Sequence, residues 1–327
     1  MKFPFPIYLL AFFGSGLVTA LALPLWRKWC WRVDLVDEPG PRKFQAQPIA
    51  LAGGLAIMTG LLVPLLLLAA LWPLNLLGPE VADKIGYGFR ARAVQLAAIL
   101  IGALGMVGLG GLDDQRELRP AAKFAGQLLL ALLVTAAGIR ITLFVPSVLF
   151  SYAVTVLWIL TVTNAFNFMD NMNGLCTGLG AIGALLFGLV AALHAQYLVA
   201  ALAFLASGAV LGFLPHNFPR ATAFLGDAGS HLVGYLMAIL AILPHFYSAR
   251  NPRVGAVLSP LLILAVPLAD LGWVVLLRWR LGRPVYVGDT NHLSHRLVRR
   301  GLSQTVAVLV IWLLAAALGS LALLWNW

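Results

Sequence analysis

The sequence predicts an all-α integral membrane protein: a polytopic bundle of about ten transmembrane helices, with eleven as the alternative count. Of its 327 residues, 61% are hydrophobic and 10% charged, whereas soluble domains carry about 25% charged residues. The mean hydropathy is +0.93. Apolar stretches recur at about the 20-residue length that crosses a bilayer. These observations exclude a soluble enzyme, a disordered chain and a collagen-like fibre.

Pro, Gly and charged residues divide the chain into ten apolar segments, each of which we expect to form one helix. The first could be a signal peptide, but no small-residue cleavage pattern precedes Arg27, so we interpret it as a retained helix. Residues 1–327 are therefore predicted to form a single transmembrane domain. The segments lie near 3–26, 48–72, 93–112, 121–138, 147–163, 176–193, 196–214, 225–243, 256–277 and 302–325.

The distribution of basic residues predicts the orientation of the bundle. Fifteen of the 22 Lys and Arg fall in the loops after the odd-numbered segments. The positive-inside rule places these loops in the cytoplasm and both termini outside. The net charge of +10 favours contact with anionic lipid headgroups or an anionic substrate. Because the basic residues are spread over loops next to the membrane, we expect no nucleic acid partner.

The acidic residues gather at the predicted cytoplasmic ends. Asp270 alone lies well inside a predicted helix. Four separate cytoplasmic connections each bring an Asp to the same depth, which favours a polar site assembled from several loops. The acidic residues at this face are Asp34, Asp37, Glu38, Asp113, Asp114, Glu117, Asp170, Asp227 and Asp289.

The first polar element closes the third segment with Asp113 and Asp114. Pro120 suits the first position of the next helix, and Lys123 and Gln127 follow it at helical spacing. The pair could form a helix-end salt bridge with Lys123. Adjacent like charges also need a compensating cation or metal.

The second element, residues 164–174, places several amides between two apolar segments. Asn164, Asn167 and Asp170 recur every three residues, which aligns them on one side of a helical turn. Met172 occupies the third ligand position of a calcium loop and excludes that interpretation. The alternative is a polar turn that caps the next helix.

The third element places Asp227 between Gly226 and Gly229 at a helix entry, shortly after His216 and Asn217. Glycines permit close backbone approach, and exposed amides at a helix start favour an anion or a metal-bound phosphate. The alternative is that Asp227 caps its own helix.

The fourth element contains His292 and His295, followed by Arg296, Arg299 and Arg300. Two histidines at this spacing could bind zinc, but the nearby sequence holds no third or fourth ligand. Imidazoles beside arginines more readily donate hydrogen bonds to phosphate oxygens.

Taken in this order, the elements resemble the polyprenyl-phosphate N-acetylhexosamine-1-phosphate transferase family of integral membrane enzymes. The resemblance extends to Asp37-Glu38-Pro39 with Arg42-Lys43, and to Pro267-Leu268-Ala269-Asp270. It is closer to the undecaprenyl-phosphate GlcNAc-1-phosphate transferase branch than to the phospho-MurNAc-pentapeptide translocase branch. The motif at Gly53-Gly54 lacks the Pro-Thr-Met-Gly-Gly form of the latter.

The resemblance implies a Mg²⁺-dependent phosphotransferase, with Mn²⁺ as the alternative ion, in the bacterial inner membrane with its active-site loops facing the cytoplasm. It would transfer N-acetylglucosamine 1-phosphate from a UDP-sugar donor to undecaprenyl phosphate. UMP would be released, in the first membrane step of a cell-envelope polysaccharide. A homodimer is the expected assembly.

Residue by residue, the resemblance implies a catalytic group, a metal site and a substrate site. Asp114 belongs to both of the first two sets. Catalytic residues are Asp113, Asp114, Asp170 and Lys123; metal ligands are Asp227 and Asp114; substrate-binding residues are Asn164, Asn167, Asn173, Asn217, Phe224, His292, His295, Arg296, Arg42 and Lys43.

Several positions depart from the family pattern. Ser294 stands where a middle His is common, Phe44 where a His often follows the Arg-Lys pair, and Asn171 and Asn173 replace a Gly and a second Asp. Loss of the acid at 173 removes a candidate uridine contact and could shift donor identity.

Three alternatives to this function stay open. The donor could be another UDP-N-acetylhexosamine. The chain could be an inactive relative that binds lipid phosphate. A lipid-phosphate transporter or flippase would place ionisable residues near the bilayer midplane, where only Asp270 lies, and would show repeated halves, of which we find none.

Overall fold

The computed structural model describes residues 5–39, 47–72, 79–247, 252–284, 286 and 289–326. Arg42, Lys43 and Phe44, singled out by the sequence, lie outside the described residues. A two-stranded antiparallel ribbon pairs Val36 with Ala50 and Asp37 with Ile49. The elements in chain order are α1 (Phe5–Arg32), β1 (Val36–Asp37), β2 (Ile49–Ala50), α2 (Gly53–Leu71), α3 (Pro79–Ala91), α4 (Ala93–Arg116), α5 (Pro120–Ala136), α6 (Val148–Met169), α7 (Leu175–Leu193), α8 (Tyr197–Asn217), α9 (Gly226–Leu240), the 3-10 turn η2 (Val254–Leu258), α10 (Ser259–Ile263), α11 (Ala265–Arg280), α12 (Leu293–Arg299) and α13 (Gln304–Asn326).

Each of the ten predicted segments contains a helix, so the all-α membrane class is confirmed. The count of ten spans is not. Within the described residues, seven helices are long and apolar enough to cross a membrane, or eight if the bent pair Val254–Ile263 and Ala265–Arg280 is one span. The difference lies mainly in α5 and α9, whose 17 and 15 residues fall short of the roughly 20 that a span needs.

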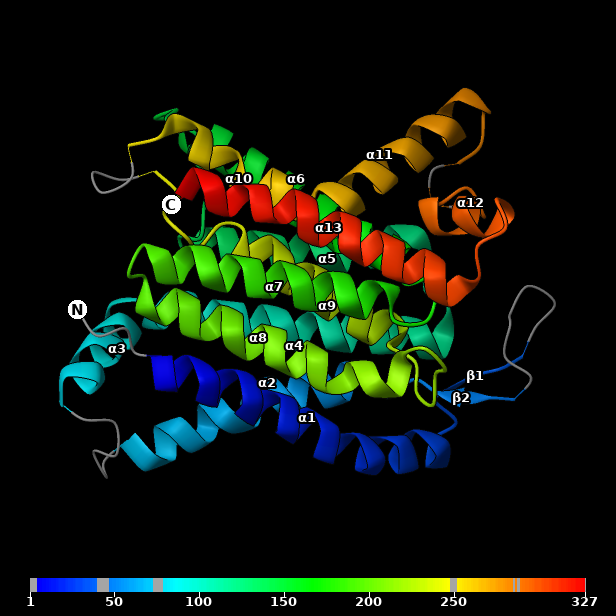
Figure 1. Cartoon of the computed structure of the whole chain (residues 1–327), viewed down its shortest axis with the longest axis horizontal. Helices are drawn as coiled ribbons and strands as arrows, with labels where there is room; N and C mark the ends of the chain where they lie inside the picture. The colour runs from blue at the N-terminus through cyan, green and yellow to red at the C-terminus, as the bar shows by residue number, and fades with distance from the viewer. Residues whose placement is uncertain are drawn as a thin grey trace.

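α7 lies at the centre of the bundle. In α7, 83% of an apolar 18-residue stretch is buried, against 22% in α1. α8 packs on α7 and α1, while α9 packs on α4, α6 and α2 (Figure 1). The outer helices expose leucines, such as Leu10 and Leu17, which suits contact with lipid.

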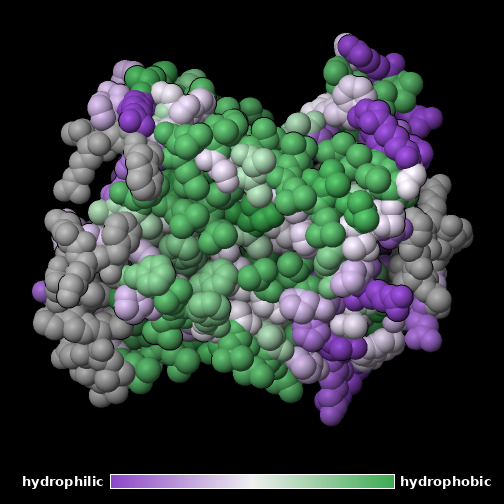
Figure 2. Space-filling model, viewed as in Figure 1, coloured by the Kyte–Doolittle hydropathy of each residue, from purple (hydrophilic) through white to green (hydrophobic). Residues whose placement is uncertain are grey.

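The bundle has two different ends. α1 begins and α13 ends at one end, whereas β1, β2 and α12 lie at the other (Figure 1). Hydrophilic side chains gather mainly at the end with α12, and a hydrophobic surface lies between the ends (Figure 2). The polar elements predicted from the sequence therefore fall at one end of the bundle.

α11 packs on α6 and α13 but leans out of the bundle. Its axis is bent by 69° from the preceding segment Val254–Ile263, and it projects away from α13 at the end of the bundle that carries α12 (Figure 1). Pro267 lies in its first turn, where a missing amide hydrogen costs no helical hydrogen bond.

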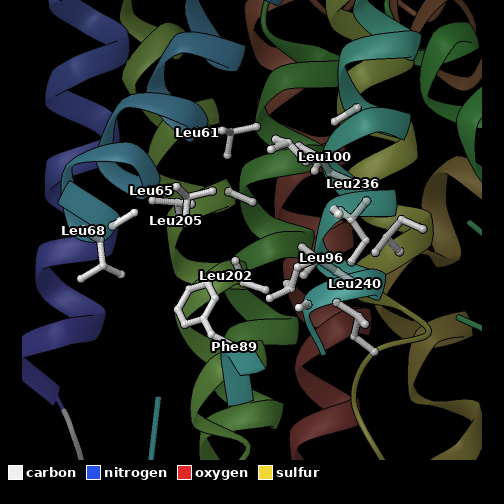
Figure 3. Close-up of a pocket in the computed structure, with 18 of the residues that line it drawn as sticks. Leu61, Leu65, Leu68, Phe89, Leu96, Leu100, Leu202, Leu205, Leu236 and Leu240 are labelled. Carbon is white, nitrogen blue, oxygen red and sulfur yellow. The ribbon is translucent and has the colours of Figure 1, made fainter. Parts of the chain in front are cut away.

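A cavity of about 640 Å³ lies between α2, α3, α4, α8 and α9. It borders the C-terminal part of α2, the N-terminal half of α4 and the C-terminal part of α9. Its wall is almost entirely apolar, and leucines of four helices surround it (Figure 3). They are Leu61, Leu65, Leu68, Leu96, Leu100, Leu202, Leu205, Leu236 and Leu240.

Candidate active site

Lys123 joins two carboxylates from different helices. Its Nζ lies 2.7 Å from Asp113 Oδ2 and 2.6 Å from Asp227 Oδ2. α5 begins at Pro120, as predicted, which places Lys123 in the first turn of that helix, opposite the C-terminal turn of α4 and the N-terminal turn of α9. Three helix ends therefore bring two negative charges onto one positive charge.

Asn167 adds a fourth helix to this cluster. From the last turn of α6, its Nδ2 donates to Asp227 Oδ1 at 2.7 Å and to Ser230 Oγ at 2.9 Å. α6 continues to Met169, beyond the predicted end at 163, so Asn164 and Asn167 lie on the helix itself. Both Asp227 oxygens thus have partners, and the carboxylate is held in one orientation.

Asp114 has a different environment from Asp113. Its Oδ1 accepts from the backbone N–H of Asp227 at 2.8 Å, and its Oδ2 accepts from that of Ala228 at 3.1 Å. Asp114 therefore caps α9, which has no side-chain cap from its own residue Leu225. The alternative interpretation, that Asp227 caps its own helix, is wrong, because Asp227 lies in the first turn of α9. The expected free amides at this helix start are instead occupied by an anion of the same chain.

Glycines allow these helix ends to approach closely. A Cβ on Gly226 would lie 2.7 Å from Asp114 Oδ2, and Gly226 has φ +70, where side chains are strained. A Cβ on Gly110 would lie 2.3 Å from the Asp227 carbonyl oxygen, and one on Gly54 would lie 2.6 Å from the Gly229 nitrogen. Side chains at these positions would push α9 away from α2 and α4 and would displace the carboxylates that these helix ends carry.

Asp170 follows α6 directly. Burial, together with the negative charges of Asp227, Asp114 and Asp37, raises the pKa of Asp170 well above its usual value. Asp170 therefore lies within electrostatic reach of the other site carboxylates. Its predicted catalytic role stays a prediction.

Among the predicted substrate-binding residues, Asn217 has a structural environment. Asn217 is buried, accepts from Gly174 N and Thr177 Oγ1 and donates to the Ala223 carbonyl. It joins the 164–174 turn to the segment before α9. Its direct contact with a substrate stays a prediction that these bonds do not favour.

Phe224 and Asn173 lie at the edge of the same turn. The backbone of Phe224 bonds to Ala50 and Gly53, which ties β2 and the start of α2 to the segment before α9. Its side chain is half-buried. Asn173 donates weakly to the Pro219 carbonyl at 3.4 Å. Both side chains are accessible enough to contact a ligand.

α12 is attached to this turn and to α11. His292 Nδ1 lies 2.6 Å from Asp270 Oδ2, and Asp270 Oδ1 accepts from Leu293 N at 2.6 Å. Asp270, the only deep acid in the sequence, is thus used to cap α12, which weakens the transporter alternative. Ser294 Oγ donates to Asn171 Oδ1 at 2.6 Å, so two departures from the family pattern bond to each other.

The remaining residues of α12 face charged and aromatic neighbours. Burial, with the charges of His292 and Arg299, lowers the pKa of His295. The Arg296 guanidinium lies 4.7 Å from the centre of the Trp273 ring on α11. Arg278, which is buried, bonds to Asp289 Oδ2 at 2.9 Å. Neutral His295 still has one N–H that can donate to a phosphate oxygen.

Residue patterns alone missed three features of this site. Ser230 contacts Asn167, Arg278 pairs with Asp289, and His231 lies buried one turn below Asp227. A usable signal was present for His231, because a histidine in an apolar helix four residues after a site carboxylate falls on the same face.

The donor set of the cluster bears on whether it can hold a divalent cation. Among the described residues, no group of three or more His, Cys, Asp or Glu is arranged to hold a metal. Asp113 and Asp227 nevertheless converge on one cation, the Lys123 ammonium. Mg²⁺ is usually bound by one or two carboxylates together with substrate phosphates. The carboxylates therefore fit a Mg²⁺ ion that substrate completes.

Fold and site together define a polytopic membrane protein whose acidic site is built from the ends of four helices. The family model for glycosyl transferase family 4 matches residues 96–245, which contain the whole Asp113, Lys123, Asn167 and Asp227 cluster.

Similar proteins cover nearly the whole chain. A probable undecaprenyl-phosphate N-acetylglucosaminyl 1-phosphate transferase of Bacillus subtilis (strain 168) is 31% identical over 93% of this chain and 81% of its own length. A decaprenyl-phosphate N-acetylglucosaminephosphotransferase of Mycobacterium tuberculosis (strain ATCC 25618 / H37Rv) is 32% identical over 93% and 77%. An undecaprenyl-phosphate alpha-N-acetylglucosaminyl 1-phosphate transferase of Escherichia coli (strain K12) is 26% identical over 94% and 81%. The chain belongs to glycosyl transferase family 4.

Proposed function

We propose that this protein transfers N-acetylglucosamine 1-phosphate from UDP-N-acetylglucosamine to undecaprenyl phosphate and releases UMP. The observation that carries the proposal is the convergence of Asp113, Lys123, Asn167 and Asp227 at one end of a membrane bundle. A water-soluble diphosphate donor and a lipid phosphate can meet only at such a surface. The names of the relatives support the donor and the acceptor.

In the proposed reaction, an ionised oxygen of the lipid phosphate attacks the phosphorus that carries the sugar. A new phosphorus–oxygen bond forms, the bond to the UMP oxygen breaks, and UMP leaves with the electron pair. The acceptor is already anionic at neutral pH, so we favour direct attack over a covalent intermediate on Asp113. Asp170 and Asp114 would then shape the charge of the site without forming a bond to substrate.

Asp227 and Asp113 would hold Mg²⁺, which would supply positive charge against the diphosphate and the leaving UMP. Asp114 is less suited to this role because its oxygens accept from the backbone of α9, whereas Asp113 and Asp227 face the shared Lys123 ammonium. Lys123 would neutralise carboxylate or phosphate charge, and His292, His295 and Arg296 would face phosphate from α12. We place this end at the cytoplasmic face of the bacterial inner membrane, in line with its basic loops.

The test is a donor panel. Purified protein in nanodiscs is supplied with undecaprenyl phosphate, Mg²⁺ and labelled UDP-sugars, and UMP release is measured together with label in the lipid phase. We expect release with UDP-N-acetylglucosamine that requires both the lipid and Mg²⁺ and stops with EDTA. Equal release without lipid, or none with any donor, would overturn the proposal. Selective release with another UDP-N-acetylhexosamine would correct the donor.

A further inference from the structure

A second layer of polar contacts lies one helical turn below the acidic cluster. α5, α6 and α9 each contribute one residue to the cluster and one to the layer beneath it. The spacing on each helix is three or four residues, which stacks the two side chains on one face. The pairs are Lys123 with Gln127, Asn167 with Asn164, and Asp227 with His231.

The lower layer is a continuous chain of hydrogen-bonding groups. Asn164 Nδ2 donates to Gln127 Oε1 at 2.7 Å. Gln127 Nε2 lies 3.2 Å from His231 Nε2, and donates to it when the imidazole proton is on Nδ1. Gln127 is 1% exposed and His231 is 0% exposed. The contacts therefore bridge α6, α5 and α9; Gln127 and His231 are buried, and Asn164 is half-buried.

Placing amides and an imidazole at this depth is unfavourable unless their partners are present. His231 Nδ1 has no hydrogen-bond partner among the described residues, so the layer is kept despite an incomplete set of bonds. Leucine would pack here without that cost. Hydrogen bonds, unlike apolar contacts, fix both the separation and the rotation of the helices that carry them.

We propose that His231 and Gln127, with Asn164, are positioning residues that hold α5 and α9 in register for the acidic cluster. They keep Lys123 Nζ within 2.7 Å of Asp113 and 2.6 Å of Asp227. In this proposal Asn164 supports the acidic cluster through Gln127 and does not bind the donor directly. The turnover test rests on the proposed transferase activity, whereas a second test does not.

The first test compares turnover in four proteins: wild type, His231→Leu, His231→Gln and Tyr235→Phe. Tyr235 lies one turn further along α9, is buried and donates to the Ile99 carbonyl at 3.0 Å. Its phenylalanine variant loses a buried hydrogen bond outside the layer. Small displacements of catalytic groups cost up to about 10²-fold in rate.

We therefore expect His231→Leu to lower kcat roughly tenfold or more while the donor KM changes little. His231→Gln retains an acceptor for Gln127 and should recover most of kcat. Tyr235→Phe should resemble wild type. The proposal is overturned if His231→Leu keeps kcat, if glutamine gives no recovery, or if Tyr235→Phe loses as much.

The second test measures helix position without turnover. The chain has two cysteines, both free, Cys30 and Cys176. On a background with both changed to serine, Lys123→Cys and Asp227→Cys are introduced together and joined with a short bifunctional thiol reagent. Adding His231→Leu should slow cross-linking about fivefold, because the two thiols are displaced from each other, and His231→Gln should not.

Unchanged cross-linking in the leucine variant would overturn the positioning role, whatever the activity. Wild-type protein that releases no UMP with any donor would refute the transferase function. The cross-linking rates would still decide whether the lower layer sets the distance between α5 and α9.

Discussion

The two halves of the same helices are built on different principles. At one end, α2, α4 and α9 approach so closely that added Cβ atoms on Gly54, Gly110 and Gly229 would overlap neighbouring atoms. At the other end, the same three helices separate around an apolar cavity of about 640 Å³. Polar side chains lie where the helices touch, and leucines line the region where the helices separate. Precise geometry is thus confined to the end that carries the carboxylates.

The largest effect is expected at the carboxylate held by both Lys123 and Asn167. Asp227→Asn should lower turnover by roughly 10³-fold or more, because a charge needed for metal and phosphate is lost. UMP release per folded protein measures it. Asp83→Asn, an exposed acid on α3 at the opposite end, is the control. Wild-type turnover in Asp227→Asn would remove Asp227 from the site.

Two adjacent glycines test whether close approach matters. Gly110→Ala would place a methyl group 2.3 Å from the Asp227 carbonyl, whereas Gly111 has nothing within 4 Å of an added Cβ. Overpacking lowers the free energy of unfolding by roughly 1–3 kcal/mol. Gly110→Ala should therefore lower the unfolding temperature and abolish most of the activity. Gly111→Ala should be neutral or slightly stabilising. Equal behaviour of the two variants in thermal unfolding would contradict the close contact.

The contact between Ser294 and Asn171 tests how α12 is held. Ser294→Ala and Asn171→Ala should each reduce kcat/KM several-fold, and the double variant should lose little more, since one hydrogen bond is worth about 1 kcal/mol. A double-mutant cycle on kcat/KM gives the coupling. Additive losses would mean that the two side chains act independently.

Asp170 gives a pH dependence whose sign follows from its surroundings. A raised pKa keeps this carboxyl protonated to higher pH, so activity that needs its charge should fall as pH is lowered through the raised pKa. Asp37→Asn removes one of the charges that raise the pKa and should move this acidic limb to lower pH. Asp34→Asn, an exposed neighbour, should leave the profile of kcat/KM unchanged. A shift in the opposite direction would contradict the assignment.

The smallest effect is expected in the cavity. Ala97→Leu and Ala206→Leu add bulk to a space that already exists, so activity and unfolding temperature should stay within about twofold and a few degrees of wild type. The same change at Ala228, buried beside Gly54 at the close end, should be far more damaging. If leucine at Ala228 were tolerated as well as leucine at Ala97 and Ala206, the distinction between the two halves would be lost.

The predictable part of the fold is the depth of each residue along its helix. Apolar length placed ten helical segments, and punctuation placed Pro120 at the start of α5. Depth also predicted that Asp113, Lys123, Asn167 and Asp227 would share one end. These features follow from local composition and spacing, which are visible in a single sequence.

Helix rotation was not predictable. Asp113 and Asp114 are neighbours in sequence, yet one bonds to Lys123 and the other to the backbone of α9. Nothing local distinguishes them, because the partner depends on how α4 faces α5 and α9. The roles of Asn217 and His231 were unpredictable for the same reason, because their partners lie on other helices or loops.

The capping of α9 by Asp114 also affects which groups can attract a charged ligand. The positive end of the α9 dipole is already neutralised inside the protein. A phosphorylated ligand arriving from the aqueous side therefore meets side-chain cations and not a bare helix terminus. Long-range attraction of the ligand then depends on side-chain charges, which dissolved ions screen. The buried contact between Asp114 and the start of α9 should respond much less to ionic strength.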